Sequence, residues 1–161
     1  SCLISSLTFG HSFFDKQLIN RNFKINSGRS EILLSEVFVT SLIGKNEYLK
    51  VDDSVTKEGL LTQFRKSDFT EAYVVNGSNK LIGKVKVNDL LRVGNKIKPF
   101  YPLIIRDTDT ISHAIEKASN FVGESIPVLD RNNKLLGVIT EADLFSQYLE
   151  VQSKISDIEK D

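Results

Sequence analysis

The chain has 161 residues, of which 40% are hydrophobic and 26% charged, a composition typical of an ordinary globular protein. Its 21 basic and 21 acidic side chains give a formal net charge of zero, which argues against a nucleic-acid-binding protein because these carry a clustered excess of Lys and Arg. No apolar run reaches the roughly 18 residues of a membrane-spanning helix, and the single cysteine, Cys2, excludes an internal disulfide.

The first part of the chain, residues 1–36, differs in character from the remainder. Residues 1–9 are apolar enough to be the end of a longer hydrophobic helix, and the chain contains no Met. We therefore expect the chain to be a fragment of a longer protein. We also expect residues 19–47 to form a polar approach segment with a turn at 26–28.

An internal repeat with an offset of 54 residues is the strongest signal in the sequence. Asn79–Gly83 (NKLIG) corresponds to Asn133–Gly137 (NKLLG), and the same offset pairs Asp89 with Asp143. The matches stay in register without a gap, so they predict two copies of one supersecondary unit.

Copy one is predicted to run strand, helix, strand, strand, helix. Asp53 and Ser54 offer an N-cap for the first helix, whose apolar residues Leu60, Leu61 and Phe64 recur at helical spacing. The predicted elements are a strand at 48–51, a helix through 59–64, a strand at 72–75, a hairpin turn at 76–79, a strand at 81–85 and a helix from about 88 to 91.

Copy two repeats this layout after a linker at 94–99. Thr108 or Thr110 is expected to cap its first helix, and Pro127 suggests that its middle strand lies at a sheet edge or that the proline marks the strand start. The predicted elements are a strand at 103–105, a helix over 111–118, a strand at 126–129, a turn at 130–133, a strand at 135–139 and a closing helix over 142–149.

These elements predict an α/β (α+β) fold in which two β-α-β-β-α motifs pack as a pseudo-two-fold pair, preceded by a helical or extended approach segment. A unit of about fifty residues is marginal alone, so the copies should share a core. We expect an N-terminal segment at 1–36, copy one at 37–96, copy two at 97–150 and a charged, helical or frayed tail at 151–161.

The second copy resembles a CBS domain. Its segment Gly137-Val-Ile-Thr140-Glu-Ala-Asp143-Leu144, preceded by Ile126-Pro-Val128, is similar to the family's motif. Copy one carries a weaker version, in which Lys86 replaces the Thr and Tyr73 the Pro. Two such copies resemble the tandem arrangement called a Bateman module, which implies a regulatory, non-enzymatic domain.

The approach segment resembles the junction between the last membrane helix and the CBS pair in chloride-channel (CLC) family proteins. The residues that carry this likeness are Ser12–Leu18, Arg21–Ile25, Gly28-Arg29 and Leu33-Leu34, with Phe14 where many members have Tyr. The resemblance implies a domain on the cytoplasmic side of the cell membrane, joined to a transmembrane chloride-transport domain of a channel or chloride/proton exchanger, and forming a homodimer.

The resemblance also implies a regulatory adenine nucleotide, ATP, ADP or AMP, and no required cofactor. Asp143 would accept hydrogen bonds from the ribose, and Thr140 would contact ribose or phosphate at a helix N-terminus that favours anions. By the chloride-channel pattern, Phe69 would stack on adenine, Thr70 supplies a small hydroxyl, and Tyr48 lies on the strand whose backbone meets the base.

Each of these residues also has a purely structural interpretation. Thr140 and Asp143 match a helix capping box, and Phe69 could belong to the core. Asp89, without a Thr partner, is better explained as a first-turn acid. Lys84 and Lys86 could supply positive charge at the phosphate end of the site, but they alternate along a strand, which favours a solvated face.

No catalytic or metal site is predicted. His11 and His113 share no metal-ligand spacing, and no nucleophile, base and acid can be grouped from the sequence. Two other functions remain open: a ligand-free CBS module that only dimerises, and a regulatory domain of a magnesium or cobalt transport protein.

Overall fold

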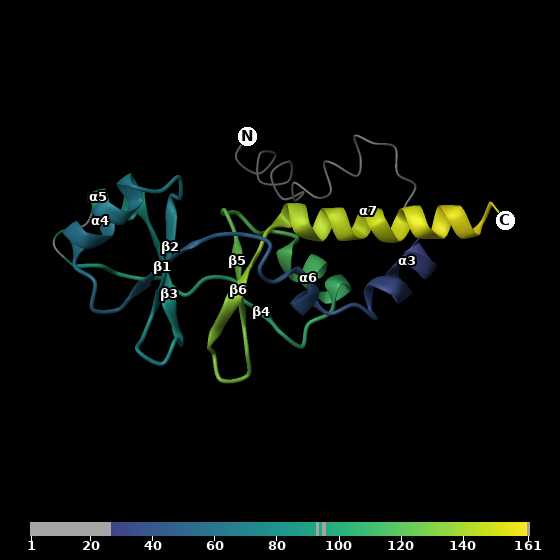
Figure 1. Cartoon of the computed structure of the whole chain (residues 1–161), viewed down its shortest axis with the longest axis horizontal. Helices are drawn as coiled ribbons and strands as arrows, with labels where there is room; N and C mark the ends of the chain where they lie inside the picture. Colours follow the sequence, from purple (N-terminus) through teal and green to yellow (C-terminus); the bar gives the residue numbers. More distant parts are fainter. Residues whose placement is uncertain (1–26, 93, 95, 161) are drawn as a thin grey trace, which may run out of the picture. The chain divides into compact units, whose positions relative to one another are not determined.

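The computed structural model describes residues 27–92, 94 and 96–160, which fall into two compact units (Figure 1). We call them the sheet unit, residues 43–106 and 126–138, and the helical unit, which comprises the remaining described residues. The sheet unit combines copy one with strands of copy two. The units follow spatial contacts and not sequence copies, so the boundaries expected at 36, 96 and 150 stay predictions.

The first sheet of the sheet unit confirms the β-α-β-β-α order predicted for copy one. Strands β1 (Leu49–Asp52) and β2 (Glu71–Val75) are parallel and are joined through helix α4 (Lys57–Arg65). Strand β3 (Leu81–Lys86) returns antiparallel to β2, and helix α5 (Val87–Arg92) comes directly after it.

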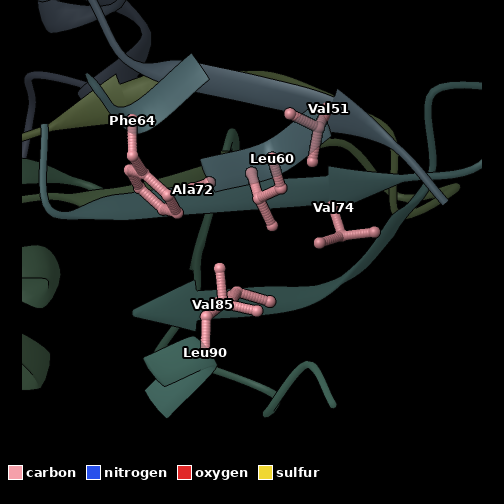
Figure 2. Packing of buried hydrophobic residues seen from close by; sticks show 7 residues of the cluster. All are labelled: Val51, Leu60, Phe64, Ala72, Val74, Val85 and Leu90. Carbon is pink, nitrogen blue, oxygen red and sulfur yellow. The ribbon is translucent and has the colours of Figure 1, made fainter. Parts of the chain in front are cut away.

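The two helices of copy one cover one face of this sheet (Figure 2). Leu60 and Phe64 of α4 and Leu90 of α5 pack against strand residues that alternate along β1–β3. Full burial of such a side chain contributes about 1.5–3 kcal/mol, so this apolar face holds the helices on the sheet. The strand residues of the cluster are Val51, Ala72, Val74 and Val85.

The cap predicted for α4 is wrong. Thr56 is the N-cap, and its side chain accepts a hydrogen bond from the backbone N–H of Gly59 at 3.1 Å. Ser54 instead closes a turn, because its backbone N–H and its hydroxyl both donate to Asp52 Oδ1. Of the two caps considered for copy two, Thr110 is the one observed.

The second sheet contains β4 (Ile105–Arg106), β5 (Ile126–Leu129) and β6 (Leu135–Ile139) in that order. Because β5 is central, the edge position considered for Pro127 is wrong. Pairing of β5 with β4 begins at Val128, so the proline lies at the strand start and its missing N–H removes no bond to β4.

The two hairpin turns are equivalent and pair with each other. Asn79 and Asn133 adopt left-handed backbone conformations, with φ of 60° and 63°. The N–H of Leu81 donates to the carbonyl of Asn133, and the N–H of Leu135 donates to the carbonyl of Asn79, both at 3.0 Å. Since each bond maps onto the other through the 54-residue offset, the two hairpin turns meet about a local two-fold axis.

The helical unit contains α3 (Ser27–Leu34), the 3-10 turn η1 (Val39–Leu42), α6 (Ile111–Ala118) and α7 (Glu141–Ile158). Helices α3 and α6 contact α7 and each other. Ser27 and Gly28 belong to α3, so the turn predicted there is wrong, and Asn26 lies outside the described residues. Among the described ranges, no helix has the length and apolar character needed to cross a bilayer.

Candidate functional site

The predicted pair Thr140 and Asp143 lies at the N-terminus of the 18-residue helix α7. Asp143 Oδ2 accepts hydrogen bonds from the backbone N–H and the hydroxyl of Thr140, at 2.7 and 2.8 Å. The backbone N–H of Asp143 in turn donates to Thr140 Oγ1 at 3.2 Å. The capping-box interpretation is therefore confirmed.

The capping box contains two kinds of group that can also contact a ligand. Asp143 supplies a carboxylate, a hydrogen-bond acceptor whose Oδ2 atom accepts both bonds from Thr140. The first N–H groups of an α-helix have no partner within the helix, and the helix dipole makes this end electropositive. The arrangement thus combines acceptors for hydroxyl groups with donors for an anion.

Glu141, which no sequence motif singled out, lies at the first residue of α7. Its Oε1 atom is buried and has no hydrogen-bond partner in the described structure. Burial raises the pKa of the Glu141 carboxyl above its ordinary value. The hydrophilic residue type gave no hint of this burial, which depends on tertiary packing.

The other three predicted residues, Tyr48, Phe69 and Thr70, lie in the sheet unit. The ring of Tyr48 meets that of Tyr73 edge to face, with centroids 5.8 Å apart and an 82° angle between the planes, and burial raises the pKa of the Tyr48 hydroxyl. Phe69 is partly exposed and belongs to neither of the two described core clusters. Thr70 is exposed, and its carbonyl accepts the N–H of Val87 at 2.9 Å.

The five residues thus form two groups in two separate units. Thr140 contacts Asp143 directly within the helical unit, whereas Tyr48, Phe69 and Thr70 belong to the sheet unit. That all five line one nucleotide site stays a prediction.

The solvated face predicted for Lys84 is wrong. Lys84 is 2% exposed and forms an ion pair with Glu71, which is 6% exposed. The chain crosses β3 here, since Phe100 exchanges two backbone hydrogen bonds with Lys84, at 2.7 and 2.9 Å. The repeat held a signal that could have revealed this burial, because the equivalent residue in copy two is the apolar Val138.

The remaining polar residues considered in the sequence fall at solvent-accessible positions. Lys86 is 43% exposed, with Nζ 3.9 Å from Glu71 Oε1 and 5.7 Å from the centroid of the Phe100 ring. Asp89 is exposed in the first turn of α5, as expected for a first-turn acid. His113 Nδ1 lies 2.8 Å from Asp109 Oδ1.

Some expectations fall outside the described residues. They concern Cys2, His11 and the chloride-channel-like junction at 12–25, including Phe14. Within the described part of the chain, no three His, Cys, Asp or Glu side chains gather closely enough to hold a metal ion.

Comparisons with known proteins give a family match for part of the chain and a similar fold for most of it. The CBS domain model matches residues 99–150, whereas curated protein sequences contain no significant match. The fold resembles that of a CBS domain pair/ACT domain protein from Thermotoga maritima, with 21% identity over 71% of this chain and 98% of that one and a TM-score of 0.59.

Two nucleotide complexes have the same fold. CBSX2 in complex with AMP is 21% identical over 72% of this chain and 98% of that one, with a TM-score of 0.57. The CBS domain of a bacterial CNNM/CorC family Mg²⁺ transporter in complex with ATP is 18% identical over 74% and 92%, with a TM-score of 0.60. Residues 99–150 therefore match the CBS domain model, and the fold of the chain is similar to that of CBS-domain pairs.

Proposed function

We propose that this chain is an adenine-nucleotide-binding regulatory domain of an ion-transporting membrane protein, and that it carries out no catalysis. The observation that carries the proposal is the Thr140–Asp143 pair at the N-terminus of α7, inside the matched CBS domain. The complexes of similar fold with AMP and ATP support the choice of ligand class.

The chemistry of the proposed site depends on its residues. Asp143 accepts hydrogen bonds from the ribose hydroxyls, and the N–H groups of the first turn of α7 bind phosphate. Phe69 offers a partly exposed flat ring to adenine, with Tyr48 and Thr70 at the base end. Lys84 is no phosphate contact in this proposal, because its ammonium group is buried against Glu71.

Binding regulates the attached protein only if the nucleotide prefers one arrangement of the CBS pair over another. We propose that occupancy shifts this equilibrium and so biases ion transport. Since the proposal contains no catalytic step, ATP incubated with the chain should be recovered unchanged.

We propose that the membrane protein containing this chain is a chloride channel or exchanger of the CLC type. This domain would lie at its cytoplasmic side and form a dimer. The support is the sequence likeness of residues 12–34, in which Phe14 departs from the family's usual Tyr. A magnesium transport protein is the second candidate, since a Mg²⁺ transporter domain shares the fold. Measuring the flux of chloride and of Mg²⁺ through the intact membrane protein in proteoliposomes distinguishes the two candidates.

Calorimetric titration with AMP, ADP and ATP tests nucleotide binding. Asp143→Ala should weaken the affinity by about tenfold or more, because hydrogen bonds to a charged group are among the stronger ones. Thr110→Ala is the control: it removes the N-cap side chain of α6, at a cost of about 1 kcal/mol, but touches no proposed ligand contact. Its affinity for nucleotide should equal that of the unsubstituted chain (the parent chain).

A thermal-shift measurement gives the complementary result. Nucleotide at about 100 times its Kd should stabilise the native state by about 2.7 kcal/mol and raise the melting temperature. If the parent chain gives no heat at millimolar nucleotide and no thermal shift, nucleotide binding is wrong. A dimer seen by light scattering would then favour the ligand-free dimerisation module.

A further inference from the structure

The ion pair between Glu71 and Lys84 is an unusual feature of the first sheet, because both side chains are almost fully buried. Tyr73 is the cross-strand partner of Lys84, and Glu71 is that of Lys86. Side chains two residues apart on a strand share a face, so Glu71, Tyr73 and Lys84 all lie on the face opposite the α4–α5 core.

Stability alone does not explain this pair. The desolvation of two buried charges commonly offsets their attraction, and apolar replacement of such pairs is often neutral or stabilising. The chain contains its own example: the equivalent positions in copy two are Ser125 and Val138, which are 8% and 0% exposed. Copy two thus has no ion pair at these two positions.

The pair instead touches the part of the sheet unit that carries three proposed nucleotide contacts. Glu71 comes directly after Phe69 and Thr70 in the chain. Lys84 Nζ lies 5.2 Å from the centroid of the Tyr73 ring, within the range of a cation–π interaction. Tyr73 in turn holds Tyr48 through the edge-to-face contact at 5.8 Å.

We infer that Glu71 and Lys84 are positioning residues that fix the base-binding end of the nucleotide site; this inference rests on the proposed function. The ion pair holds the start of β2, and with it Phe69 and Thr70. The Lys84 ammonium group also holds the Tyr73 ring, against which Tyr48 packs. A site held this way binds its ligand with less loss of side-chain freedom.

The sharpest variant replaces the pair by its copy-two equivalent, Glu71→Ser with Lys84→Val. This chain should keep a thermal unfolding midpoint close to that of the unsubstituted chain, because copy two has Ser and Val at the equivalent positions. Its affinity for ATP should fall by about tenfold, the lower end of the cost of removing orienting partners at metal sites. Its preference for ATP over GTP should also decrease, because the base-binding end is the part that loosens.

A second measurement needs no nucleotide. Backbone hydrogen exchange in residues 69–75 should become faster in the double variant, while the equivalent residues 123–129 of copy two should exchange as in the parent. If the double variant does not fold, Glu71→Gln tests the same point, because it keeps the shape of the side chain and an acceptor for Lys84 but removes the charge.

The outcomes separate this inference from the proposed function. A parent chain that binds no nucleotide contradicts both. A parent chain that binds ATP, with a folded double variant of equal affinity, equal base preference and unchanged exchange at 69–75, contradicts the positioning role alone. A simple structural role would lower the unfolding midpoint and weaken ATP and GTP binding together, and this result too would overturn the inference.

Discussion

The carboxyl group of Glu141, at the start of α7, lies beside the proposed nucleotide contacts and has one buried oxygen atom. Glu141 lies next to the Thr140–Asp143 capping box, and a negative charge at a helix N-terminus is normally favourable. Its Oε1 atom is nevertheless buried without a partner, and its pKa is raised. Because desolvation raises this pKa, we expect the ionised side chain to be less favourable in the folded chain than the protonated one.

Replacement of Glu141 by Gln should therefore stabilise the protein at neutral pH. Burial raises the pKa of Glu141 in the folded state above its ordinary value of 4.5. Below that ordinary value, the group is protonated in both the folded and the unfolded chain and causes no penalty. As pH rises through the raised folded pKa, the penalty develops in the parent but not in Glu141→Gln.

Urea unfolding of both chains across this pH range checks the prediction. The stability difference in favour of Glu141→Gln should be present at pH 7 and should shrink towards zero below about pH 4.5. Other titrating groups are common to both chains and cancel in the comparison. A difference that does not vary with pH would show that ionisation of Glu141 is not its cause.

At the scale of elements, the two glycines of the repeat, Gly83 and Gly137, mark places where another chain segment passes close to a strand. A Cβ atom at Gly83 would lie 2.7 Å from both the Phe100 carbonyl oxygen and Pro99 Cβ. The Phe100 carbonyl also accepts the N–H of Lys84, so it cannot move away without loss of that bond. At Gly137 the close atom is Ile43 Cγ2, the end of a side chain, which can adjust.

These contacts predict a graded series of alanine substitutions. Gly83→Ala should lower the free energy of unfolding by about 1–3 kcal/mol, as overpacking commonly does, and Gly137→Ala by less. Gly77→Ala is the control, because a Cβ there has no neighbour within 4 Å, and a small gain of about 0.4–1 kcal/mol is expected. Chemical denaturation of the three variants measures the order, and equal losses at positions 77 and 83 would contradict it.

Local chemistry decided which elements could be predicted from the sequence. The hairpins β2–β3 and β5–β6 were predictable because their strands are rich in β-formers and their turns carry Asn at the left-handed positions 79 and 133. The burial of Lys84 was not predicted from the strand pattern, because the pattern does not show that Phe100, near the start of copy two, pairs with β3 at this residue.

The candidate site was predictable to a similar extent. The Thr140–Asp143 pair belongs to a local motif, and the structure shows the contact. Glu71 and Glu141 were not predicted, because a charged residue at a strand or helix start is normally solvated. Only the packing around them reveals that Glu71 is buried and that the Oε1 atom of Glu141 is shielded from water.

At the scale of the whole molecule, helix α7, at the end of the chain, packs against helix α3, which precedes copy one. The predicted tail at 151–161 was expected to be helical or frayed, and the helix continues to Ile158. Val151 and Ile155 are each 8% exposed, and α7 contacts α3, in which Leu34 is buried. The tail is thus part of the helical unit and its core.

Removal of residues 151–161 should therefore destabilise the protein. It eliminates two buried apolar side chains, each of which contributes about 1.5–3 kcal/mol, so the free energy of unfolding should fall by about 3 kcal/mol or more. Removal of residues 160–161 alone is the control, because Lys160 is exposed and lies beyond the last turn of α7. Urea unfolding compares the three chains. Were the 151–161 deletion to unfold at the parent's midpoint, α7 beyond residue 150 would add no stability and the helical unit would not need it.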